Sequence, residues 1–227
     1  MGGEGIRLKP MGPQVLPHEL DDSDGSVLVR LARASVEERL AGGGRLDVRR
    51  FLESLGVRGA RLRKLMRPGA AFVTIESLTG RIREMRGCIG AITPIDPLAE
   101  TVARVSVESA TSDPRFPPME KAELDSVVFE VTVLGRLEAL PGNPKKRVEM
   151  IEIGRHGLMV EKPPNAGLLL PQVAIDEGWD PHLFLTWTCI KAGLPGTCWL
   201  DSNVKVYRFD AAAWAEKEPK GRIYRRL

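Results

Sequence analysis

Residues 70–93, AAFVTIESLTGRIREMRGCIGAIT, decide the fold class of this chain of 227 residues. The first part, AAFVTIES, is rich in residues that favour β-strands, and LTG at 78–80 is a turn signal. After the turn, the residues alternate without a clean polar face. We therefore predict a β-hairpin whose second strand contains Cys88.

Strand patterns elsewhere in the chain are separated by helical ones. Residues 126–140, SVVFEVTVLGRLEAL, alternate as a strand, while GLMVEK and AGLLLP, separated by PPN, predict another hairpin. A late strand begins in VKVYRFDAAAW, and the helical patterns cover residues 27–40, 94–111, 172–179 and 181–194. Because hairpins and helices are interspersed without a regular βαβ succession, we predict an α+β fold with a mainly antiparallel sheet flanked by helices.

The two ends of the chain differ in composition from the middle. Residues 1–22 hold four Gly and three Pro without a lasting apolar period, which predicts a flexible N-terminal arm. The C-terminal end contains the basic run KGRIYRRL, so residues 213–227 are interpreted as a solvated basic tail. The folded domain is then expected at residues 23–212.

The composition narrows the class of protein. A net charge of +3, from 33 basic and 30 acidic residues, does not favour a nucleic-acid binder. No apolar run approaches the roughly 20 residues that span a bilayer, and the first residues lack a secretory signal, so we expect a cytoplasmic protein. The chain has 33 Lys and Arg but only three Asn and two Gln, and this composition fits a heat-adapted source or a GC-rich genome.

Common cofactor and metal motifs are absent from the sequence. There is no phosphate loop, no dinucleotide-binding glycine turn, no C-x-x-C and no H-E-x-x-H. With three His and three Cys scattered over the chain, we expect neither a metal site nor a cofactor. Whether Cys189 and Cys198 form a disulfide stays open at this point.

Cys88 has two interpretations. It is either a small buried hydrophobe between glycines, or a thiol placed where another molecule binds. Gly87 and Gly90 leave the thiol without bulky neighbours along the strand. Arg86 lies two residues earlier, so in a regular strand its charge is on the same face and stabilises a thiolate. A nucleophile needs a base, for which His156 is the best candidate.

Three further polar residues stand in settings that suggest a site. Glu130 interrupts an apolar strand, so it either lies on a half-exposed face or is buried and needs a partner. Asp113 and Arg115 lie in the proline-bounded loop TSDPRFPP, where they either pair to hold the loop or contribute to binding.

A family resemblance runs through MRGCIGAI, ESATSDPRFPPMEKAELDSVVFEVTVL, GRHGLMV, GLLLPQVAIDEGWD and TCIKAGLP. In this combination and order, from about residue 26 to 210, the chain resembles the AMMECR-one domain family. Met85 replaces the leucine of that family's L-R-G-C-I-G hallmark. The matching positions are Arg86, Gly87, Cys88 and Gly90, then Asp113, Arg115, Phe116, Pro117 and Pro118, and finally His156 and Gly157.

The resemblance implies a larger and a smaller subdomain around a cleft, with the hallmark as the functional site. It also implies genomic company with Memo-type proteins and radical-SAM enzymes, so the partner we expect is one of these, but it supplies no reaction. Two hypotheses follow: an enzyme or enzyme component with Cys88 as nucleophile or transient acceptor and His156 as base, and a non-catalytic binding or adaptor module. A third, weak nucleic-acid binding, rests on the modest basicity alone.

Overall fold

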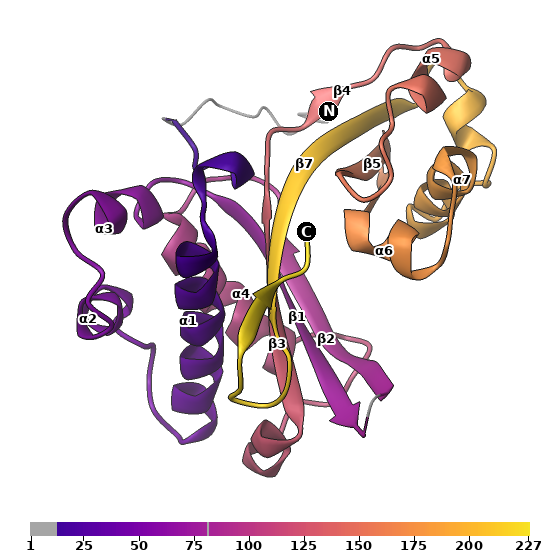
Figure 1. The fold of residues 1–227 in the computed structure, drawn as a ribbon. Coiled ribbons are helices and arrows are strands. Elements are labelled where there is room, and N and C mark those ends of the chain that lie inside the picture. The colour runs from indigo at the N-terminus through magenta and orange to yellow at the C-terminus, as the bar shows by residue number, and fades with distance from the viewer. Residues whose placement is uncertain (1–12, 81) are drawn as a thin grey trace, which may run out of the picture. The chain divides into compact units, whose positions relative to one another are not determined.

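The structure, a computed structural model, describes residues 13–80 and 82–227 and divides into two compact units (Figure 1). The first unit contains the chain up to Leu134 together with Ala213–Arg225, and the second contains Gly135–Ala212 with the last two residues. Each unit combines strands with helices, and every strand pair described is antiparallel. The predicted α+β class with a mainly antiparallel sheet flanked by helices is confirmed.

The first unit is built around the predicted hairpin. Its strands are β1 (Ala70–Thr79), β2 (Ile82–Ala91), β3 (Val127–Leu134), the end of β7 (Lys205–Glu216) and β8 (Ile223–Arg225). They follow the order β2-β1-β3-β7, with β8 paired to β7, so β2 is an edge strand. All eight residues of β3 are buried, which explains why its sequence is nearly continuously apolar.

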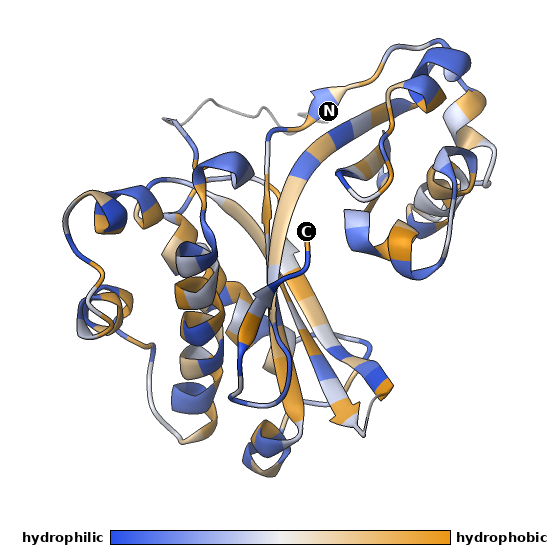
Figure 2. Cartoon of the chain, viewed as in Figure 1, coloured by the Kyte–Doolittle hydropathy of each residue, from blue (hydrophilic) through white to orange (hydrophobic). Residues whose placement is uncertain are grey.

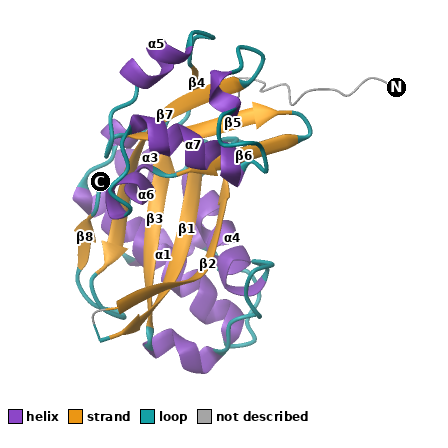
Figure 3. Ribbon diagram, turned by 90° about the vertical axis from the view of Figure 1, so that its right-hand side faces the viewer, coloured by secondary structure: helices purple, strands orange, loops and turns teal. Residues whose placement is uncertain are grey.

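Two helices, α1 (Asp22–Leu40) and α4 (Leu98–Thr111), cover one face of this sheet. The unit also contains α2 (Val48–Ser54), which packs on α1 and α4, the helix α3 (Gly59–Leu65), and short 3₁₀ turns at Pro17–Glu19 and Lys121–Asp125. α1 begins where the Asp21 carboxylate accepts the Asp24 N–H at 2.8 Å. α4 packs against α1, β1 and β2, and Figure 3 shows α1 and α4 on the same side of these strands. Hydrophobic residues accordingly concentrate on the strands and on the inner faces of the helices (Figure 2).

The second unit has its own core. Its strands are β4 (Glu138–Ala139), β5 (His156–Lys162), β6 (Asn165–Leu169) and the first part of β7. Its helices are α5 (Pro144–Glu149), α6 (Pro171–Asp176) and α7 (Pro181–Lys191), with a 3₁₀ turn at Cys198–Leu200. Cys189 and Cys198 form a disulfide within this core. The buried Arg147 side chain donates hydrogen bonds to the carbonyls of Pro141, Trp199, Asp201 and Val204.

The expected flexible arm is wrong where the structure describes it. Residues 1–12 lie outside the described part of the chain. From residue 13 onward the segment is anchored: Val15 is fully buried and donates its N–H to Pro68 O at 2.8 Å. The Arg67 guanidinium donates to the carbonyls of Pro13 and Gln14 at 3.0 and 2.7 Å. These backbone contacts hold the segment despite its glycines and prolines.

Part of the expected basic tail at residues 213–227 is strand instead. Ala213–Glu216 complete β7 as buried residues, and β8 pairs with them from Trp214↔Arg225 to Glu216↔Ile223.

Among the residues that the structure describes, no helix has the length and apolar character needed to cross a bilayer.

Candidate functional site

A β-bulge determines where Cys88 points. The register between β1 and β2 shifts by one residue next to Ile75, which leaves Arg86 as the extra residue and places Cys88 opposite Thr74. Without the bulge, Gly87 would lie opposite Thr74 and Cys88 would point to the other face of the sheet. The bulge therefore places the Cys88 thiol on the same face of the sheet as Thr74.

An aspartate–arginine pair holds the free edge of β2 at Cys88. The buried Asp113 carboxylate accepts the Cys88 N–H at 2.8 Å and two guanidinium N–H groups of Arg115 at 2.9 and 2.6 Å. The same guanidinium donates to the Cys88 carbonyl at 3.2 Å and to Met85 Sδ at 3.3 Å. Both backbone groups of this edge residue are thus satisfied by side chains.

The electrostatics of this pair follow from its geometry. The Arg115 hydrogen bonds hold the pKa of Asp113 well below the usual aspartate range, and the Asp113 carboxylate in turn raises the pKa of Arg115. The Asp113 side chain is 3% exposed while that of Arg115 is 43% exposed, so the pair has a buried anion and an accessible cation. Asp113 and Arg115 do pair, as one interpretation of the loop predicted, and they also fix the strand that carries the cysteine.

The thiol itself is half-buried, and burial raises the pKa of Cys88. The Thr74 hydroxyl donates to Cys88 Sγ at 3.2 Å, and this bond and the Arg115 charge act to lower that pKa. The Glu130 and Asp113 carboxylates act in the opposite direction. Since desolvation is the largest of these effects, the thiol is favoured over the thiolate.

Arg86 does not have the predicted role beside the thiol. Its guanidinium donates to both carboxylate oxygens of Glu123, at 2.7 and 3.0 Å, and these bonds lower the pKa of Glu123. The guanidinium carbon also lies 6.0 Å from the centre of the Phe116 ring. Because Arg86 is the extra residue of the bulge, the alternation expected of a regular strand does not apply to it. The cation whose charge acts on Cys88 is Arg115.

The predicted open space beside the two glycines is occupied. A Cβ on Gly87 would lie 2.1 Å from the Ser109 carbonyl oxygen, so this glycine allows α4 to approach the sheet. A Cβ on Gly90 would lie 2.2 Å from the Phe72 ring, which packs over that position from the neighbouring strand. Both glycines are explained by packing against other parts of the protein rather than by room for a ligand.

Ser109 of α4 contacts both strands of the hairpin. Its hydroxyl accepts the Ile89 N–H at 2.9 Å and lies 2.8 Å from the Val73 carbonyl and 2.7 Å from the Val105 carbonyl, either of which can accept its single proton. A single side chain therefore links the helix to β1 and β2, one residue away from Cys88.

Glu130 belongs to the same row as the thiol. In the register of the sheet, Glu130 of β3 lies opposite Thr74, which lies opposite Cys88. Glu130 is buried, and the Thr132 hydroxyl donates to its carboxylate at 3.4 Å. Of the two alternatives for this residue, the buried and partnered one is observed.

His156 lies in the second unit, at the start of β5. Its Nδ1 accepts the Glu152 N–H at 2.9 Å, and its Nε2 lies 3.7 Å from an Asp210 carboxylate oxygen. Burial lowers the pKa of His156, so the imidazole is neutral with its proton on Nε2. The lone pair that a general base needs is occupied by a backbone N–H, which gives His156 a local structural role in this loop.

The structure brings Cys88, Asp113, Arg115 and Glu130 together and adds Thr74 and Ser109, which the sequence did not single out. The register shift at the bulge has no clear sequence signal, and that shift places Thr74 beside the sulfur. Within residues 13–80 and 82–227, no cluster of three or more His, Cys, Asp or Glu side chains is arranged to hold a metal ion.

The first unit therefore defines an α+β protein with one free cysteine on an edge strand, fixed by a buried aspartate and a half-exposed arginine. The chain belongs to the AMMECR1 family, the AMMECR-one family named above, which matches residues 29–214.

The chain is also similar to other proteins and to a solved structure. A protein of Aeropyrum pernix is 57% identical over 98% of this chain and 92% of its own length. A protein of Thermofilum pendens is 44% identical over 92% of this chain and 97% of its own length. The crystal structure of an uncharacterised Pyrococcus horikoshii protein has a TM-score of 0.82 at 41% identity, and covers 92% of this chain and 98% of that one.

Proposed function

We propose that this protein is a binding module that docks a partner through the β2 edge around Cys88, and that the cysteine acts as a neutral thiol. The observation that carries this proposal is the edge strand β2, where an exposed Met85 lies beside an Arg115 guanidinium that Asp113 holds in place. Burial raises the pKa of Cys88, which favours the neutral thiol. The nearby Arg86 and Arg115 are already engaged by carboxylates, which reduces their ability to stabilise a thiolate.

The surface beside the thiol has the composition of a docking site. Met85 is 49% and Ile82 is 64% exposed on β2, and the Arg115 guanidinium is accessible while its position is fixed by Asp113. An exposed methionine and a pre-ordered arginine are residue types enriched in protein interfaces. The partner we propose is a Memo-type or radical-SAM protein, the company that the family resemblance implies.

The test is co-purification of this chain with a coexpressed Memo-type or radical-SAM protein. Met85→Glu is expected to abolish the complex, because it replaces an exposed apolar side chain beside Arg115 by a charged one. Met150→Glu is the matched control, since Met150 is 37% exposed in the second unit. Cys88→Ser is expected to retain the complex. No complex with either partner, or equal loss in both Met variants, would contradict the proposal.

The second candidate function is covalent chemistry at Cys88. The Thr74 hydroxyl, 3.2 Å from Cys88 Sγ, and the Arg115 charge both favour a thiolate, and these two observations support covalent chemistry. The rate of iodoacetamide alkylation against pH separates the two functions. For a binding module, the midpoint lies at or above that of an ordinary thiol, near pH 8.5. A midpoint about two pH units lower, together with an activity lost in Cys88→Ala, would favour the enzyme.

A further inference from the structure

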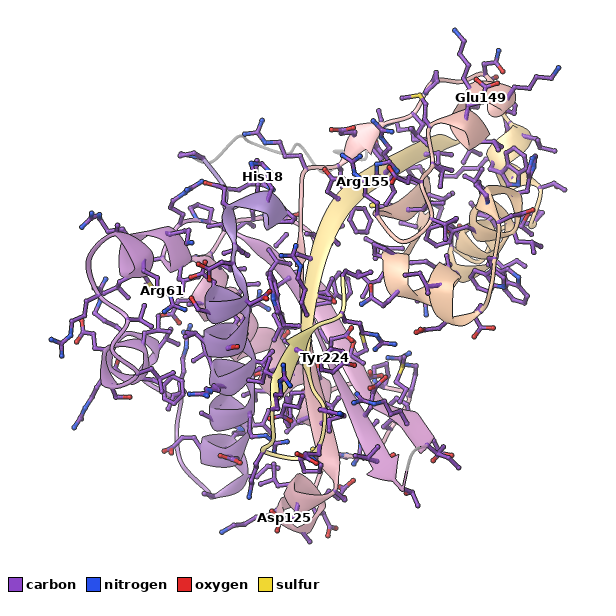
Figure 4. All side chains as sticks on the ribbon, viewed as in Figure 1. His18, Arg61, Asp125, Glu149, Arg155 and Tyr224 are labelled. Carbon is purple, nitrogen blue, oxygen red and sulfur yellow. A yellow bond between two sulfur atoms is a disulfide. The ribbon has the colours of Figure 1, made fainter. Side chains whose placement is uncertain are left out.

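A basic groove lies in the first unit, away from the thiol. It has about 790 Å³ of space and is formed by the adjoining ends of β1 and β2 and by the hairpin between β7 and β8. Lys217, Arg222 and Tyr224 line it from the hairpin, and Arg83 lines it from β2. Figure 4 labels Tyr224 on the short β8 strand.

Two like charges face each other across this hairpin. The Lys217 N–H donates to the Arg222 carbonyl at 2.8 Å, which continues the pairing of β7 and β8 beyond Glu216↔Ile223. Alternation along the strands puts the side chains of Lys217, Arg222 and Tyr224 on one face. In the part of the chain that the structure describes, neither Lys217 nor Arg222 forms an ion pair. Like charges directly opposite each other destabilise a strand pair, so strand pairing alone does not favour this arrangement.

The other charged groups of the groove are held in place. The Arg83 guanidinium donates to the carbonyls of Glu216 and Lys217 at 2.9 and 3.1 Å and to the Glu76 carboxylate at 3.0 Å. Arg83 therefore adds positive charge and fixes β2 to the hairpin without offering many free donors. Glu218 is the acidic residue of the lining, and its side chain folds back over the turn, where a Cβ on Gly221 would lie 2.2 Å from Glu218 Cγ.

We infer that this groove binds a small phosphate-bearing ligand of the nucleotide class. Lys217 and Arg222 supply charge-assisted donors to phosphate oxygens, for which an ammonium and a planar guanidinium are both suited. The Tyr224 ring, 36% exposed on the same face, offers a surface for a base. The space lies within the several hundred Å³ typical of small-ligand sites.

The inference is tested by titrating the full chain with pyrophosphate and with ADP in a calorimeter. The paired change Lys217→Ala and Arg222→Ala is expected to weaken both ligands about tenfold or more, because each charge-assisted bond contributes on this order. The same pair is expected to raise the unfolding midpoint, since it removes the repulsion across the hairpin. Tyr224→Ala is expected to weaken ADP while leaving pyrophosphate unchanged.

Two controls complete the test. Changing the exposed Arg49 and Arg50 to Ala removes the same charge from α2 and is expected to leave binding unchanged. Met85→Glu, which is expected to abolish the partner complex, is also expected to leave nucleotide binding unchanged, so failure of the partner proposal does not affect this one. The inference is overturned if neither ligand binds saturably, or if the Arg49 and Arg50 control loses as much affinity as the groove variant. Binding of a single-stranded oligonucleotide without binding of ADP or pyrophosphate would also overturn it.

Discussion

Replacing Asp113 by Asn tests the central interaction of the candidate site. Asn has almost the same shape, but its NH₂ cannot accept hydrogen bonds, so one of the two carboxylate oxygens is lost as an acceptor. The oxygen nearest the strand accepts both the Cys88 N–H at 2.8 Å and an Arg115 N–H at 2.6 Å. Leaving a buried donor without its acceptor costs about 1–3 kcal/mol, and we expect about 2 kcal/mol for opening the β2 edge at Cys88.

Hydrogen–deuterium exchange of residues 84–93 measures this opening directly. A loss of about 2 kcal/mol corresponds to roughly thirtyfold faster exchange where local opening limits the rate. Asp125→Asn is the matched control, since Asp125 pairs with Lys220 on the surface and we expect no change in the same peptide. Unchanged exchange in Asp113→Asn would show that Asp113 does not hold this strand and would refute the account of the site.

The same variant predicts a pH dependence. The folded-state pKa of Asp113 lies below the ordinary value of about 3.9, so its contribution to stability is fully present above that pH. The contribution is lost as the pH falls from there toward the folded-state pKa. The difference in unfolding free energy between the wild type and Asp113→Asn should therefore shrink below about pH 4 in acid titrations. A difference that stays constant would contradict the ionised pair.

Three other substitutions test the packing. Gly87→Ala should lower the unfolding free energy by about 2–3 kcal/mol, because the new methyl group meets the backbone of α4. Gly44→Ala is the control, since the space around Gly44 is open and we expect no loss of stability. Denaturant titration of both variants measures the difference in unfolding free energy. Cys198→Ser should lower the unfolding free energy of the second unit by about 2–3 kcal/mol, because it removes the disulfide with Cys189 and the loop that this bond closes. Thermal unfolding with and without reductant measures this loss. Arg147→Met should cost about 3 kcal/mol, because the carbonyls it serves lose their donor, and an unchanged melting curve would disprove that role.

The sequence predicts the elements whose structure depends on residues close to them along the chain. The hairpin at 70–93 was predicted from propensity and a turn signal, and it is observed as β1 and β2. β8 was missed because its three residues become a strand only by pairing with Trp214–Glu216, a contact that their composition does not indicate. Gly87 was predicted to leave room for a ligand, but a helix carbonyl from residue 109 occupies that space. The role assigned to Arg86 failed because the bulge interrupts the alternation on which the argument relied.

The Ser109 hydroxyl couples α4 to the hairpin of β1 and β2. Because this side chain accepts the Ile89 N–H and lies against the Val73 carbonyl, a displacement of α4 breaks contacts with both strands next to Cys88. A displacement of α4 is thereby transmitted to the strand that carries Cys88. Substitutions along that helix can alter the behaviour of the thiol without touching it.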